Sequence, residues 1–163
     1  MEGSERVNSI KDNAMFRNLV SQIEELEADR IFCRHGMDHF LDVARIAALM
    51  AVDEGLDIAR DIIYATALLH DIGRAEQYRS GTEHELASAA IAPFILSECG
   101  YSEEETDEIV TAIINHGNEA VKEQNDLTGL LYRADKASRK CYMCKVTDRC
   151  HKKPEKLVMD ILY

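Results

Sequence analysis

The sequence contains few of the residues that interrupt helices. Only two prolines and eight glycines occur among its 163 residues, and no segment alternates apolar and polar residues for long enough to form a convincing strand. Apolar residues instead recur at the spacing of amphipathic helices. We therefore expect an all-α fold, a bundle of about six to seven helices over residues 8–28, 38–54, 57–70, 83–99, 102–115, 126–140 and 153–162.

The sequence also lacks a long apolar run. No stretch approaches the roughly 20 continuous apolar residues of a membrane-spanning helix. The first residues, Met-Glu-Gly-Ser-Glu, have neither the basic start nor the apolar core of a signal peptide, so a cytoplasmic protein is the expectation. With 163 residues and 46% hydrophobic content, the chain is long enough for one core and too short to need two. A single domain over residues 1–163 is predicted.

Positive charge is scarce. The sequence has 19 Lys and Arg residues and 30 Asp and Glu residues, which gives a net charge of −11. Since phosphate neutralisation dominates binding to nucleic acids, polymers are poor partners unless a local basic patch exists. A small phosphate ester is compatible with this charge, because divalent ions and a few arginines can make a pocket locally positive. The expected partner is a small phosphorylated molecule, and the sequence leaves open whether the chain forms a homodimer.

Histidine and aspartate stand at helix positions that face the predicted core. His70 and Asp71 follow an apolar run over residues 62–69 that is typical of a buried helix. Burying both is costly unless a cation receives them. Four other residues share the inward stripe of a predicted helix: His39, His84, His116 and Asp135. One such position is commonly core packing, but five helices that each offer a nitrogen or a carboxylate oxygen are more simply explained by convergence on metal.

These residues resemble the pattern of the HD superfamily of metal-dependent phosphohydrolases, from about residue 30 to about residue 140. The matching motifs are His39 in HFLDVAR, His70 and Asp71 in ALLHDIG, and Asp135 in ADK. The resemblance implies an HD-domain helical bundle in which a first metal takes His39, His70, Asp71 and Asp135. His84 and His116 are similar to the extra ligands of the subset with two metals, where Asp71 bridges to the second.

The donor types favour particular metals and a particular reaction. Neutral imidazole suits Mn, Fe, Co, Ni and Zn, whereas Mg and Ca prefer oxygen ligands. A bridging carboxylate can hold two ions about 3.5 to 4 Å apart for in-line attack on a phosphoryl group. We therefore expect two divalent transition metals, Fe, Mn or Zn, and hydrolysis of a nucleotide or related metabolite by a metal-bridging water.

Two other functions stay open at this point. A redox-active iron pair on the same ligands would serve an oxygenase, and oxygen-dependent loss of substrate would distinguish it. A non-catalytic module could instead keep the fold and bind a nucleotide without turnover. The intact set of six ligand positions counts against that second alternative.

Further residues near the ligands are candidates for catalysis or substrate binding. Arg74 replaces the lysine that the family often has, so we expect it to grip an anion rather than transfer a proton. Lys136 could reach a substrate phosphate or pair with a nearby acid. His35, one helical turn before His39, could donate a proton, contact an anion or cap a helix. With Asp71, these are the predicted catalytic residues, and the predicted substrate-binding residues are Arg34, Tyr78 and Arg79.

Three of the five cysteines lie in a basic C-terminal tail, residues 139–163. Cys141, Cys144 and Cys150 begin with the Cys-x2-Cys spacing of a zinc knuckle or an iron–sulfur half-site. His151 or Cys33 could supply a fourth ligand to a separate Zn or Fe-S site. The alternative is three reduced thiols packed on the domain. The tail could also touch an anionic substrate, because it starts a few residues after Asp135.

Overall fold

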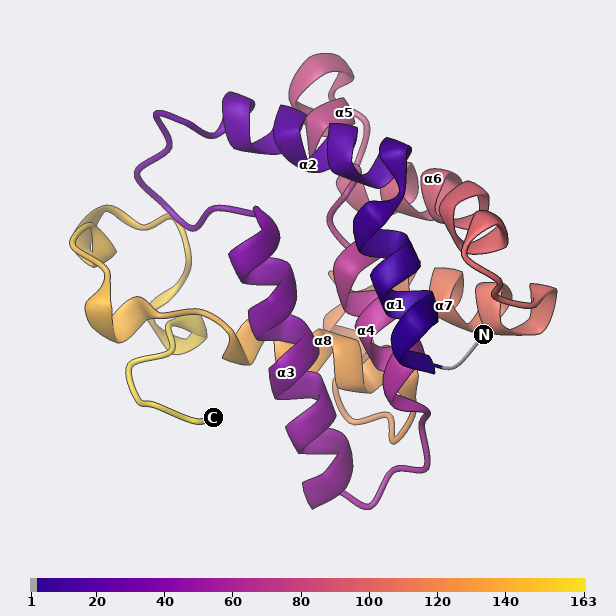
Figure 1. The fold of residues 1–163 in the computed structure, drawn as a ribbon. Helices are drawn as coiled ribbons and strands as arrows, with labels where there is room; N and C mark the ends of the chain where they lie inside the picture. The colour runs from indigo at the N-terminus through magenta and orange to yellow at the C-terminus, as the bar shows by residue number, and fades with distance from the viewer. Residues whose placement is uncertain (1–2) are drawn as a thin grey trace.

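The computed structural model describes residues 3–163, so the first two residues of the predicted domain lie outside it. Within that range the chain forms eight α-helices and no strand (Figure 1), and the all-α prediction is confirmed. The helices are α1 (Gly3–Asp12), α2 (Ala14–Leu26), α3 (Met37–Asp53), α4 (Arg60–Leu69), α5 (Arg74–Ser80), α6 (His84–Glu98), α7 (Glu103–Asn115) and α8 (Leu127–Ala137). Short 3-10 turns occupy Glu119–Val121, Cys141–Met143, Thr147–Arg149 and Pro154–Lys156.

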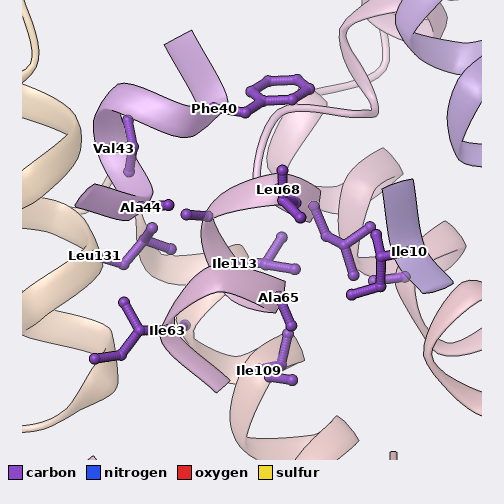
Figure 2. Packing of buried hydrophobic residues seen from close by; sticks show 14 of the residues in the cluster. Ile10, Phe40, Val43, Ala44, Ile63, Ala65, Leu68, Ile109, Ile113 and Leu131 are labelled. Carbon is purple, nitrogen blue, oxygen red and sulfur yellow. The ribbon is translucent and has the colours of Figure 1, made fainter. Parts of the chain in front are cut away.

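Helix α4 is the centre of the bundle. Every residue from Ile62 to Leu69 except Tyr64 is buried, as expected of a helix that is apolar all round. It packs against α1, α3, α7 and α8. Figure 2 shows side chains from all five helices meeting in this core: Ile10, Val43, Ile63, Ala65, Leu68, Ile109, Ile113 and Leu131. The helix thus carries the His70-Asp71 pair at its carboxyl end into the interior.

Helix α1 is tied to the bundle by one arginine. The Arg6 guanidinium donates hydrogen bonds to Asp61 at the start of α4 and, at 2.8 Å, to Glu105 in the first turn of α7. It also lies 4.3 Å from the ring centroid of Tyr101. Glu105 is itself half of a capping box with Ser102, so the same carboxylate starts α7 and anchors α1.

Three predicted boundaries were wrong. The helix expected over residues 8–28 is two helices, because the Asn13 side chain accepts hydrogen bonds from Met15 N and Phe16 N and starts α2 there. The interval between the helices predicted at 57–70 and 83–99 contains a further helix, α5. The helix expected over residues 153–162 is only the 3-10 turn Pro154–Lys156. Residues 157–162 are apolar at nearly every position and mostly exposed, so they offer no single face to pack.

The C-terminal tail folds back over the segment between α2 and α3 (Figure 1). There the rings of Phe32 and His151 meet edge to face, with centroids 6.0 Å apart. Along residues 3–163, no helix combines the length and the apolar character that crossing a bilayer requires.

Candidate metal centre

All six predicted metal ligands converge at one place, and each comes from a helix end or the residue beside it. His39 is in the first turn of α3, His70 and Asp71 follow α4, His84 begins α6, His116 follows α7, and Asp135 is in the last turn of α8. The donor atoms form two groups, and within each group all of the atoms lie within 4.8 Å of one another. The first contains His39, His70 and Asp71, and the second contains Asp71, His84 and His116.

The first group, with Asp135, forms what we call half-site 1. The Nε2 atoms of His39 and His70 are 3.3 Å apart. They lie 3.6 and 3.5 Å from Oδ2 of Asp71, and 3.5 and 3.8 Å from Oδ1 of Asp135. Two imidazole nitrogens and two carboxylate oxygens therefore surround one small volume.

The second group forms half-site 2. The Nε2 atoms of His84 and His116 are 3.1 Å apart, and they lie 3.2 and 3.4 Å from Oδ1 of Asp71. Asp71 thus directs one carboxylate oxygen to each half-site, which is the arrangement of a bridging ligand.

The donor atoms fit divalent ions. Nδ1 of His70 donates to Ala67 O and Nδ1 of His116 donates to Ile113 O, each at 2.6 Å, so their Nε2 atoms present lone pairs to the centre. Oδ1 of Asp71 is buried and accepts no hydrogen bond from any described residue. Two ligands about 2.1 Å from an ion and at roughly tetrahedral or octahedral angles lie roughly 3.0 to 3.4 Å apart. The observed separations are close to this range. Ions would therefore accept the lone pairs of nitrogen and oxygen atoms that otherwise face one another.

Asp71 and His70 have the charges that a metal site requires, whereas His116 would have to lose a proton. Burial alone would raise the pKa of Asp71, but His70 and Arg74 hold that pKa well below its usual range. Burial lowers the pKa of His70, which keeps the ring neutral and able to ligate. Burial would also lower the pKa of His116, but Asp71 outweighs it and raises that pKa. A metal would compete with this proton.

The glycine of the HDIG motif sets the distance between the half-sites. Gly73 N donates to Ser88 Oγ at 2.9 Å, which holds the residues after Asp71 against α6. A Cβ at Gly73 would lie 2.4 Å from Ser88 N and 2.5 Å from His84 O. Only glycine permits this approach, and the approach brings His84 to Asp71.

The other predicted site residues divide into two sets. Arg34, His35, Arg74 and Lys136 line the cavity that opens onto the metal centre. Lys136 Nζ donates to Oδ2 of Asp135 at 2.5 Å and to His116 O at 3.2 Å, so it supports two ligands. Tyr78 and Arg79, on α5, are not among the lining residues.

One functional residue escaped the sequence analysis. Glu27 is 2% exposed and accepts hydrogen bonds from His35 N and Nδ1, each at 2.6 Å, and from the Tyr78 hydroxyl at 2.5 Å. Burial would raise its pKa, but the bonds from His35 and Tyr78 lower it to about 2. A signal was present, because Glu27 continues the buried stripe of Phe16, Val20 and Ile23 on α2.

The cysteines do not form a donor group of this kind. Cys33, Cys141, Cys144 and Cys150 all line the same cavity. Across residues 3–163, however, the groups of donor atoms close enough to share an ion include no cysteine. A separate Zn or Fe-S site in the tail therefore stays a prediction.

Comparison with known proteins agrees with the fold. The family model for the HD domain matches residues 36–140. An uncharacterized protein of Clostridium beijerinckii is 42% identical over 159 residues, which is 98% of this chain and 99% of the relative. The crystal structure of a predicted HD superfamily hydrolase from an uncultured Thermotogales bacterium superposes with a TM-score of 0.61, covering 88% of this chain and 81% of that one, at 23% identity. That likeness shows the fold.

Ribonucleases Y are also related, over a small part of their length. The ribonuclease Y of Pseudothermotoga lettingae is 33% identical over 101 residues, 62% of this chain and 18% of the relative. Ribonuclease Y 1 of Pediococcus pentosaceus is 26% identical over 83% of this chain and 24% of the relative. The chain therefore spans at most about a quarter of either enzyme. Because the family model covers well over half of the sequence, the chain belongs to the HD domain family.

Proposed function

We propose that the protein is a metal-dependent phosphohydrolase with a two-metal centre, acting on a nucleotide or a related small phosphate ester. The observation that carries this proposal is the position of Asp71, which directs one oxygen to each of two histidine pairs. A pair of ions so held would lower the pKa of a water molecule and polarise the phosphoryl oxygens.

Arg74 is placed to bind the substrate's phosphoryl group. Its Nε lies 3.1 Å from Oδ1 of Asp71 without the geometry of a hydrogen bond, and its side chain lines the cavity. A guanidinium fixed beside the centre stabilises negative charge that develops on phosphoryl oxygens. Lys136 acts indirectly, because it positions two predicted ligands by donating hydrogen bonds to the Asp135 carboxylate and the backbone carbonyl of His116.

His35 is the proton carrier in this proposal. Its Nδ1 donates a hydrogen bond to Glu27. Its Nε2 therefore remains available to a substrate in the cavity, which His35 lines. Burial lowers the pKa of His35, so the ring is neutral near pH 7. It therefore accepts a proton or a hydrogen bond at Nε2 before it can donate one to the leaving oxygen.

A second candidate substrate is a phosphodiester bond in RNA. The similarity to two ribonucleases Y favours it. The bond type is chemically close to a nucleotide's phosphate ester, and the same centre would serve both.

Elemental analysis of protein purified without added metal or chelator tests the proposal. We expect about two equivalents of Fe, Mn or Zn per chain, about one in His84→Ala, and two in the control Asp53→Asn, whose aspartate is exposed at the end of α3. One equivalent that His84→Ala leaves unchanged would point to a mononuclear enzyme. Metal that disappears when Cys141 and Cys144 are replaced would belong to the tail.

Phosphate release from nucleotides and cleavage of RNA into shorter products are then measured with and without oxygen. Hydrolysis in both conditions supports the proposal. Substrate loss only in oxygen would identify an oxygenase, and binding without turnover by the metal-loaded protein would identify a binding module.

A further inference from the structure

The cavity above the metal centre is far more basic than the protein around it. Its volume is about 700 Å³. Eight Lys and Arg line it against four Asp and Glu, whereas acids outnumber bases by 30 to 19 in the chain as a whole. The lining therefore reverses the sign of the protein's net charge at this one place.

The eight lining cations divide by whether a carboxylate neutralises them. Three are paired: Arg74 with Asp71, Lys136 with Asp135, and Lys140 with Asp42. The other five form what we call the basic wall: Arg30, Arg34, Arg139, Lys145 and Lys152. No carboxylate within residues 3–163 forms an ion pair with any of these five.

The basic wall belongs to two segments that meet across the cavity. Arg30 and Arg34 lie between α2 and α3, and their guanidinium groups donate to backbone carbonyls of residues 28, 30 and 33. The other three lie in the tail, where Arg139 donates to the carbonyl of residue 156. Phe32 and His151 join the two segments. The three arginines of the basic wall are therefore held in place by backbone contacts and not by acids.

Lys152 shows the imbalance most clearly. It is partly buried, and burial together with the nearby charges of Arg139 and Lys136 lowers its pKa. Cations that are removed from water and crowded together are unfavourable unless an anion joins them. Among residues 3–163 none does, so the anion that fits is one that enters the cavity.

We propose that the basic wall is a second anion subsite, which binds a phosphate of the substrate other than the one being hydrolysed. The substrate class is then a short single-stranded oligonucleotide, of which a 5′-phosphorylated dinucleotide is the smallest member. This inference rests on the proposed phosphohydrolase function. A cavity of about 700 Å³ lies in the upper part of the roughly 300 to 1,000 Å³ range of small-molecule sites, which leaves room beyond a mononucleotide.

Two features argue that the subsite lies partly outside the HD domain and is limited in length. The tail cations Lys145 and Lys152 lie beyond residues 36–140, the part that the HD model matches. Outside the cavity the protein is acidic, so nucleotides beyond the first few gain little from phosphate contacts.

The test compares thymidine 5′-monophosphate with 5′-phosphorylated dithymidylate, using wild type and the variant K145Q/K152Q. Neither lysine makes a hydrogen bond or an ion pair to any described residue, so the exchange removes charge without removing a contact. The control is K11Q/K122Q, which removes the same charge from exposed lysines outside the cavity and loses only the exposed ion pair of Lys11 with Asp12. Both kcat/KM and the Kd for fluorescently labelled ligands are measured on metal-loaded protein, and circular dichroism and Tm verify folding.

We expect kcat/KM and affinity for the dinucleotide to fall about 10-fold or more in K145Q/K152Q, with the mononucleotide and the control variant changing less than about threefold. The loss should also shrink as salt increases. Equal losses for both ligands, or no advantage of the dinucleotide in wild type, would overturn the subsite. Affinity that keeps rising in longer oligonucleotides would also overturn it, in favour of an open surface.

Failure of the proposed function gives a different pattern. If neither ligand is hydrolysed at any phosphate ester but K145Q/K152Q still weakens dinucleotide binding selectively, the result supports the subsite and contradicts the hydrolase function. If both ligands are hydrolysed at rates that K145Q/K152Q does not change, the result supports the hydrolase function and contradicts the subsite.

Discussion

The Glu27 carboxylate holds the imidazole of His35 by a hydrogen bond of 2.6 Å to Nδ1. It holds the backbone of the same residue through its other oxygen, also at 2.6 Å. His35 in turn meets the ring of His39 edge to face at 5.5 Å between centroids. A buried acid at the carboxyl end of α2 therefore positions a ring of the cavity and supports a predicted ligand of half-site 1.

Replacing this acid should change how stability depends on pH. The pKa of Glu27 is lowered from its usual 4.5 to about 2, so its stabilisation is complete above about pH 4.5 and is lost as the pH falls towards 2. Glu27→Gln should cost about 1 to 3 kcal/mol at pH 7, and the difference from wild type should shrink below pH 4.5. Urea denaturation at several pH values measures this.

The control for that experiment is Glu25→Gln, an exposed position on the same helix. It should change stability by less than about 0.5 kcal/mol at any pH. A cost of Glu27→Gln that stays constant from pH 7 to pH 3 would contradict the role given to the ionised carboxylate.

Gly73→Ala should weaken half-site 2 more than half-site 1. The added Cβ would overlap Ser88 N and His84 O and push α6 away, at a cost of about 1 to 3 kcal/mol or more. His84 would move from Asp71, so bound metal should fall towards one equivalent. Elemental analysis and chemical denaturation check both effects.

Gly55→Ala is the control that separates a general loss of stability from a specific loss of metal at half-site 2. Gly55 has a φ of 66° and open space around its Cβ position, so alanine there should cost about 1 kcal/mol and leave the metal content intact. Equal metal contents in both variants would show that Gly73 does not set the distance between half-sites.

Removing metal should destabilise the fold. The Asp71 and Asp135 carboxylates and four histidine nitrogens face one another in the interior, and ions that bind only the folded state stabilise it by mass action, by about 2.7 kcal/mol at a hundredfold excess over Kd. Tm should fall on treatment with a chelator and recover when Mn²⁺, Fe²⁺ or Zn²⁺ is added. Asp71→Asn should be nearly insensitive to both treatments. A Tm of wild type that the chelator leaves unchanged would contradict this account of the centre.

Arg74 should affect turnover without affecting metal content. It is placed beside the centre but is not a donor to an ion, so Arg74→Ala should lower kcat/KM by about 10²-fold or more and retain both metal equivalents. Arg74→Lys should recover only part of the loss, because lysine lacks the planar fork. Loss of metal in Arg74→Ala would instead make the arginine a support for Asp71.

The convergence of the six predicted ligands could be expected because each of them follows a simple helical pattern. His39 shares its stripe with Val43 and Met50, and those two residues are buried in α3 as expected. Glu27 was missed although it continues the apolar stripe of α2, because its partners lie 8 and 51 positions away and sequence spacing does not show them. The cavity was unpredictable for a similar reason, since its wall joins residues 30–35 to the tail.

With an ion in each half-site, as proposed, the position of Asp71 between them would make metal binding a linked equilibrium. One carboxylate orients its two oxygens for both ions, so occupancy of either half-site alters the charge and orientation that the other offers. By reciprocity, the factor by which the first ion changes affinity for the second is the same whichever half-site fills first. A single metal dissociation constant would therefore describe neither half-site, and a titration of wild type fitted with independent sites should leave systematic residuals.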